Sequence, residues 1–117
     1  MKSGTDLIND AKTRIAEIGA QDALALHANG TAIFVDIRDQ QEVNLGKVPG
    51  ALHISRGTIE TRIEAAVPRD ATVVLYCASG NRSALAADTL QQMGYTKVTS
   101  LAGGFRAWAE RGGEIDG

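Results

Sequence analysis

The sequence predicts an α/β fold, in which a central parallel β-sheet carries helices on both faces and follows an N-terminal helical extension. Short apolar segments with β-branched residues alternate with segments of helical periodicity from residue 33 onward. Strands that alternate with helices are joined by right-handed crossovers and lie parallel in one sheet. The length of 117 residues suits a single domain.

The first half of the chain is predicted to contain two helices, a helical turn and two strands. In chain order these are a helix over 5–18, a helix over 20–28, a strand over 32–35, a helical turn starting at 39–42 and a strand over 51–54. We assign residues 1–18 to a helical extension and residues 19–117 to the main domain. The apolar face of the first helix is expected to pack within the chain.

The second half continues the alternation of strands and helices. The segment 72–76 is the clearest strand, because it combines β-branched and aromatic residues. In chain order the predicted elements are a helix over 59–66, a strand over 72–76, a helix over 83–93, a strand over 97–101 and a helix over 105–111.

Composition excludes several classes of function. The net charge of −2 gives no basic surface for nucleic acid, and no apolar segment is long enough to span a membrane. One cysteine cannot form an internal disulfide, and with two histidines it makes a poor metal-binding set. The N-terminus lacks the apolar segment of a signal peptide. We therefore expect a cytoplasmic protein that binds no metal, no nucleic acid and no membrane.

The single cysteine, Cys77, lies at the edge of the predicted sheet where proteins of this architecture bind their ligands. In open α/β sheets, ligands bind beyond the carboxyl ends of the strands. Cys77 directly follows a predicted strand, and Asp36 and Arg56 follow two others. A thiol that served only as a small apolar residue would more naturally lie within the strand. We therefore expect Cys77 to lie in a loop outside the core.

The residues after Cys77 predict an anion-binding loop. Backbone N–H groups between Ala78 and Arg82 can form a nest for an anion, and the helix that follows adds the partial positive charge of its N-terminus. Arg82 contributes a full positive charge. All three features favour thiolate over thiol, so we expect the pKa of Cys77 to be lowered and its sulfur to be reactive. The small side chains of Ala78, Ser79 and Gly80 would let a substrate approach closely.

This loop resembles the active-site loop of rhodanese-like sulfurtransferase domains. The resemblance lies in the pattern Cys-x-x-Gly-x-Arg-Ser, which begins at Cys77 after an apolar strand. An earlier part of the chain resembles a second signature of that family. It consists of Asp-Ile-Arg at 36–38, followed by Glu42 and by Gly-Lys-Val-Pro-Gly-Ala at 46–51. Each of these segments alone would carry the resemblance only weakly, and their order along the chain strengthens it.

The C-terminal part of the chain extends the same resemblance. Gly103 and Gly104, followed by Trp108, resemble the Gly-Gly-x-x-x-Trp element of the family. The match then covers residues 33–113. One departure is visible, because Lys47 stands where the family often has histidine. Lys47 precedes a predicted strand, and we assign it no catalytic role.

The resemblance implies a single-domain sulfurtransferase. Cys77 would attack the outer sulfur of a small-molecule donor such as thiosulfate and carry that sulfur as a persulfide. Cyanide or a thiol would then accept the sulfur, and the natural acceptor, a cellular thiol or a protein, is not identified. The resemblance implies no cofactor. The residues expected to bind the donor are Ala78, Ser79, Gly80, Asn81 and Arg82.

Other charged residues near the predicted site have two interpretations. Asp36 and Arg38 fit an ion pair that braces neighbouring loops better than a catalytic pair. Arg56 either attracts an anionic donor or is an ordinary exposed arginine. His27 and His53 have no neighbours in sequence that predict a cysteine–histidine couple.

Functions other than sulfur transfer stay open. A phosphatase or an arsenate reductase of similar architecture also uses a cysteine, an arginine and an amide cradle. Its loop is one residue longer than the four residues that separate Cys77 from Arg82, and this loop offers no general acid. A non-catalytic module that binds partners or senses redox state would also keep a thiol of low pKa. A carrier that passes persulfide sulfur to a biosynthetic enzyme would share the sulfurtransferase chemistry.

Overall fold

The fold is organised around a parallel β-sheet of five strands, which confirms the predicted fold class. The structure is a computed structural model that describes residues 1–117. The strand order is β1-β5-β4-β2-β3. The strands are β1 (Ala16–Ile18), β2 (Ile33–Asp36), β3 (Leu52–His53), β4 (Val73–Tyr76) and β5 (Val98–Leu101). Because β4 is central and buried along its whole length, the loop that follows it leaves from the middle of the sheet.

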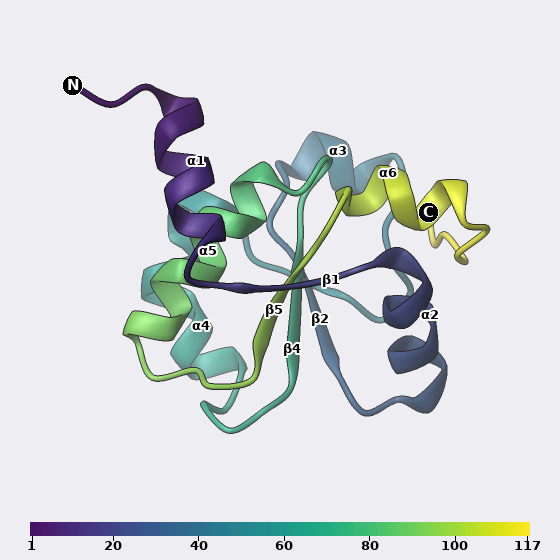
Figure 1. The fold of residues 1–117 in the computed structure, drawn as a ribbon. Coiled ribbons are helices and arrows are strands. Elements are labelled where there is room, and N and C mark those ends of the chain that lie inside the picture. The colour runs from purple at the N-terminus through teal and green to yellow at the C-terminus, as the bar shows by residue number, and fades with distance from the viewer.

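Helices cover both faces of this sheet (Figure 1). Helices α1, α4 and α5 lie on one face, and α2 and α6 lie on the other. The helices are α1 (Gly4–Lys12), α2 (Ala20–Asn29), α3 (Gln40–Asn44), α4 (Ile59–Ala66), α5 (Asn81–Gln92) and α6 (Gly104–Glu110), with a 3-10 turn η1 (Arg56–Thr58) before α4. None of them combines the length and the apolar character needed to cross a membrane.

Two hydrophobic cores form because successive side chains of a strand point to opposite faces of the sheet. Val73 and Leu75 of β4 lie in the core beneath α4 and α5, together with Leu90. Val74 and Tyr76 of the same strand lie in the core beneath α2 and α6. The two cores hold β4 between them, which fixes the position of the chain where the strand ends.

The N-terminal segment differs from the prediction of one helix over 5–18. Helix α1 ends at Lys12, and Ala16–Ile18 form the edge strand β1, which pairs in parallel with β5. Pairing supplies hydrogen bonds to the open edge of β5, such as the one from the Ala102 N–H to the Ile18 carbonyl. These tertiary hydrogen bonds outweigh the helical spacing of the apolar residues. The domain boundary at residue 18 stays a prediction.

Helix α1 packs within the chain, as expected, against α5. Ala11 is buried in this contact. The Arg14 guanidinium donates two hydrogen bonds to the Asp88 carboxylate, with N–O distances of 3.1 and 2.8 Å. This pairing holds the C-terminal end of α1 beside α5, whose first turn lies at the loop that follows Cys77.

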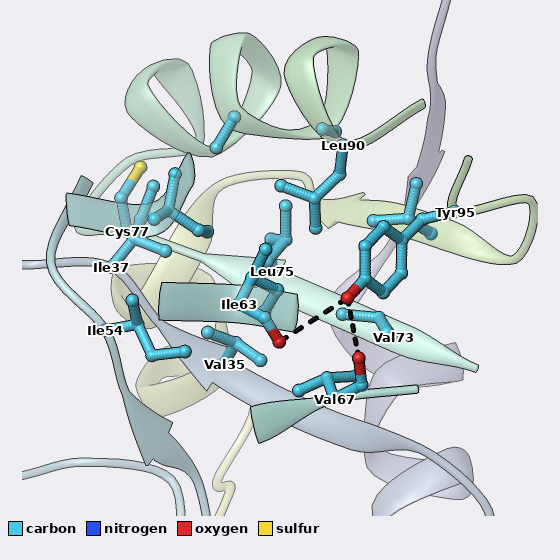
Figure 2. Close-up of a cluster of buried hydrophobic side chains, with 14 residues drawn as sticks. Val35, Ile37, Ile54, Ile63, Val67, Val73, Leu75, Cys77, Leu90 and Tyr95 are labelled. Atoms are coloured by element: carbon cyan, nitrogen blue, oxygen red, sulfur yellow. Dashed lines mark hydrogen bonds between the residues drawn. The ribbon is translucent and has the colours of Figure 1, made fainter. Parts of the chain in front are cut away.

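Tyr95 provides a test of the core beneath α4 and α5. Its buried hydroxyl donates a 2.6 Å hydrogen bond to the Val67 carbonyl and lies 3.4 Å from the Ile63 carbonyl (Figure 2). Tyr95→Phe is expected to lower the free energy of unfolding by about 1–2 kcal/mol, because it leaves a buried carbonyl without its donor. Urea unfolding measures this change.

The matched control is Thr61→Val, which removes an exposed hydroxyl that donates to the Thr58 carbonyl. This control is expected to change the free energy of unfolding by less than about 0.5 kcal/mol. Equal stability of the Tyr95→Phe variant and the control would contradict the assigned role of the Tyr95 hydroxyl.

Candidate active site

Cys77 lies at the carboxyl end of β4, and it is buried, which corrects the prediction that it lies outside the core. Only 1% of the residue is exposed, and it belongs to the hydrophobic cluster beneath α4 and α5. Figure 2 shows its sulfur at one end of that cluster, on the side of α5. The prediction failed because the chain after Cys77 folds back over the sulfur and hydrogen-bonds to it.

Backbone N–H groups of the loop converge on the Cys77 sulfur. The Gly80 N–H donates to Sγ with an N–S distance of 3.1 Å, and the Ser83 N–H donates at 3.4 Å. Gly80 is the N-cap residue of α5 and has no side chain to accept the free N–H groups of the first turn. The Cys77 sulfur takes that place, so it lies where the partial positive charge of the helix is concentrated.

A hydroxyl completes the hydrogen bonds around the sulfur. Ser83 Oγ lies 3.5 Å from Cys77 Sγ and 2.7 Å from Ser100 Oγ, and both serines are fully buried. Burial raises the pKa of Cys77, but hydrogen bonds from the Ser83 side chain and from the backbone of Ser83, Ser79 and Gly80 outweigh it. The net effect is a lowered pKa of the Cys77 thiol.

Arg82 is held by a partner that the sequence analysis did not assign to it. Its guanidinium donates two hydrogen bonds to the Glu42 carboxylate of α3, at 3.1 and 3.2 Å. This pairing raises the pKa of Arg82 and lowers the pKa of Glu42. Arg82 thus pairs with a carboxylate of the protein itself. Glu42 therefore balances much of the positive charge that Arg82 places near Cys77.

The first turn of α6 fixes the back of the Cys77 loop. The Phe105 N–H donates to the Cys77 carbonyl at 2.8 Å, and the Arg106 N–H donates to the Ala78 carbonyl at 3.2 Å. Gly104 has a φ of +59°, and a Cβ atom at this position would collide with the carbonyl groups of Cys77 and Ala78. Gly104 is therefore required for the close approach of α6 to the loop.

Asp36 and Arg38 form a buried ion pair next to the site. Arg38 Nη2 lies 2.7 Å from Asp36 Oδ2, and it also donates to the Gly46 carbonyl. The guanidinium lies over the Phe105 ring, 4.3 Å from its centroid. Burial alone would lower the pKa of Arg38, but the hydrogen bond to Asp36 raises it. The pair joins the end of β2, the loop at Gly46 and helix α6.

The remaining charged candidates make their side-chain hydrogen bonds outside the Cys77 loop. The Arg56 guanidinium pairs with Glu60 at 3.2 Å. His27 and His53 lie within hydrogen-bond distance of the carbonyls of Pro49 and Arg38, at 2.8 and 2.7 Å. The hydrogen bonds that reach the sulfur therefore come from backbone N–H groups and a hydroxyl rather than from histidine. None of the three surface cavities is lined by a residue of the Cys77 loop.

Comparison with known proteins identifies the family of this chain. The family model for the rhodanese-like domain matches residues 19–111. The chain belongs to the rhodanese-like domain family. A protein named sulfurtransferase from Allochromatium vinosum is 42% identical over 80 residues, which represent 68% of this chain and 74% of that relative.

Solved structures resemble this rhodanese-like domain over most of its length. A protein of unknown function from Rhodopseudomonas palustris, described as a possible tyrosine phosphatase, is 38% identical with a TM-score of 0.91, and the match covers 99% of this chain and 96% of that one. A rhodanese-related protein from Thermoplasma volcanium is 27% identical with a TM-score of 0.77, covering 86% and 97%. The human single domain sulfurtransferase is 26% identical with a TM-score of 0.74, covering 81% and 96%.

Sequence reasoning missed three partners in this rhodanese-like site. Ser83 stood in the loop pattern, but its hydroxyl was not assigned to the sulfur. Glu42 stood in a second signature, and its pairing with Arg82 crosses 40 positions of sequence. Ser100 gave one usable signal, a small polar residue between Thr99 and Leu101 in a buried strand. Nothing in the sequence shows that its hydroxyl meets Ser83.

Substitution of Gly104 tests the approach of α6 to the loop. Gly104→Ala is expected to lower the free energy of unfolding by more than about 3 kcal/mol, because the new methyl group collides with main-chain atoms. Gly112→Ala is the control, since Gly112 also has positive φ (+81°) but has open space around its Cα. It is expected to lower the free energy by about 1 kcal/mol. Equal losses in urea unfolding would contradict a steric role for Gly104.

Substitution of Glu42 tests the electrostatic effect of Arg82 on the sulfur. Glu42→Gln is expected to lower the pKa of Cys77 by about half a unit, because it leaves the Arg82 charge unbalanced. The pH dependence of alkylation of this only cysteine measures that pKa. The control is Glu60→Gln, which removes the carboxylate that pairs with Arg56. This control is expected to leave the pKa of Cys77 unchanged. A pKa that rises or stays constant with Glu42→Gln would mean that Arg82 does not act on the sulfur.

Proposed function

We propose that this protein is a sulfurtransferase that carries sulfane sulfur on Cys77 as a persulfide. The observation that supports it best is that the Gly80 N–H and the Ser83 N–H both donate to the Cys77 sulfur, with Ser83 Oγ 3.5 Å from the same atom. Such donors favour the thiolate, which is the nucleophilic form of cysteine. Membership of the rhodanese-like family and the sulfurtransferase from Allochromatium vinosum support the same reaction class.

The proposed reaction has two displacement steps. With thiosulfate as donor, the Cys77 thiolate attacks the outer sulfur, a new S–S bond forms, and the old S–S bond breaks. Sulfite leaves with the bonding electron pair, so the persulfide keeps one negative charge. Cyanide or a thiolate then attacks the outer sulfur of the persulfide and regenerates the Cys77 thiolate. Because the enzyme is covalently modified between the two substrates, the kinetics are expected to be ping-pong.

The residues from Ala78 to Arg82 are proposed to bind the donor at the rim of the loop. Asn81 is exposed there, and its side-chain oxygen lies 3.5 Å from the ammonium group of Lys12. Lys12 thus brings a positive charge from α1 to the loop, which favours an anionic donor. A role for Arg56 in attracting the donor stays a prediction.

Phosphatase activity is the second candidate, because a similar protein is described as a possible tyrosine phosphatase. Two observations weigh against it here. The loop has four residues between Cys77 and Arg82, one fewer than the loop of such a phosphatase. In addition, this loop offers no general acid for a leaving alkoxide.

Intact-mass spectrometry tests the proposed sulfur transfer. Incubation with thiosulfate is expected to add one sulfur atom (about 32 Da) to the protein, and cyanide is expected to remove it. Cys77→Ser is the control, because its hydroxyl still accepts hydrogen bonds from the first turn of α5 while it cannot form a persulfide. This variant is expected to fold and to gain no mass.

Other outcomes of that experiment identify the competing functions. Sulfur loading of the Cys77→Ser variant would contradict Cys77 as the carrier. No loading by thiosulfate or by low-molecular-weight persulfides, together with Cys77-dependent hydrolysis of an aryl phosphate, would favour a phosphatase. No loading and no hydrolysis would favour the non-catalytic, partner-binding or redox-sensing module.

A further inference from the structure

We infer that Ser100, a residue of β5 outside the Cys77 loop, is a positioning residue that holds the Ser83 hydroxyl in the orientation that donates to the Cys77 sulfur. Ser100 does not contact the sulfur itself. It acts through Ser83, whose Oγ lies 2.7 Å from Ser100 Oγ and 3.5 Å from Cys77 Sγ. The two serines and the cysteine thus form a buried chain of three polar groups that joins β4, α5 and β5.

The hydroxyl groups of Ser83 and Ser100 hydrogen-bond only to each other and to the Cys77 sulfur. Ser83 Oγ is the only hydrogen-bond partner of the Ser100 hydroxyl, and both serines are 0% exposed, so no solvent reaches them. A buried hydroxyl is retained at a cost unless it is hydrogen-bonded. Alanine would fill the Ser100 position with almost the same shape. The serine hydroxyl therefore has an energetic role only through Ser83.

Counting hydrogens along the chain gives the direction of its effect. When Cys77 is a thiol, the three groups carry three hydrogens (the S–H and two O–H groups). Only two hydrogen bonds join the three groups, so one hydrogen is left without an acceptor. When Cys77 is a thiolate, two O–H hydrogens serve the same two links. Ser83 then donates to the sulfur, and Ser100 donates to Ser83. The buried chain is fully satisfied only in the charged state, so Ser100 favours the thiolate.

This arrangement predicts coupling between the two serines. Without Ser100, the Ser83 hydroxyl still reaches the sulfur, but nothing donates to its oxygen to orient and polarise it. Without Ser83, the Ser100 hydroxyl has no link to the sulfur. The effect of Ser100 on Cys77 must therefore disappear when Ser83 is replaced.

A double-mutant cycle on the Cys77 pKa tests the inference. The pH dependence of iodoacetamide alkylation is measured for wild type, Ser100→Ala, Ser83→Ala and the double variant. Ser100→Ala is expected to raise the midpoint by about 0.5–1 pH unit in the wild-type background and to leave it unchanged in the Ser83→Ala background. Thr99→Val is the control, because the Thr99 hydroxyl lies on the same strand but faces the Val73 carbonyl. This control is expected to leave the midpoint unchanged.

Two outcomes would overturn the inference. An unchanged midpoint in Ser100→Ala would mean that the hydroxyl only fills space, and an equal shift in both backgrounds would mean that Ser100 acts by a route other than Ser83. The alkylation assay needs no sulfur donor, so the inference is tested separately from the proposed function. A shifted midpoint without persulfide formation would uphold the role of Ser100 and contradict sulfur transfer.

Discussion

A buried sulfur atom that accepts hydrogen bonds from the first turn of a helix is the feature on which the rest of the site depends. Cys77 ends the central strand, and its sulfur occupies the place of an N-cap side chain for α5. Burial by itself would keep the group neutral. Each hydrogen bond to a charged group contributes about 1.5–3 kcal/mol, so a few donors are enough to reverse that preference. The same contacts shape the loop and activate the nucleophile.

The elements around the loop explain how so compact a cradle keeps its shape. Helix α6 approaches from behind, and Gly104 permits the contact of its first turn with the carbonyls of Cys77 and Ala78. Glu42 fixes the guanidinium of Arg82 at the side of the loop. The charge of the sulfur is consequently stabilised at close range by neutral donors. This suits a site that carries one sulfur atom better than a site that must surround a phosphate group.

The sequence predicted the sheet, the alternation of elements and the position of Cys77, because these follow from local periodicity and from where strands end. It did not predict that Ala16–Ile18 would be a strand, since that choice depends on the open edge of β5 far along the chain. The burial of Cys77 and its contacts with Ser83 were not predicted either, because they also depend on how the chain packs in three dimensions. Hydroxyl and carboxylate partners such as Ser100 and Glu42 are set by tertiary packing, which one sequence does not encode in any local pattern.

The measurement that tests this account most directly is a pH titration of the Cys77 thiolate by its ultraviolet absorbance. The native protein is compared with the same protein unfolded in urea, and the Cys77→Ser variant supplies the background. The account predicts that the native midpoint lies below that of the unfolded chain, which is expected near the ordinary cysteine value of about 8.5. A native midpoint at or above the unfolded value would mean that burial outweighs the hydrogen bonds, and it would contradict the central role of the cradle.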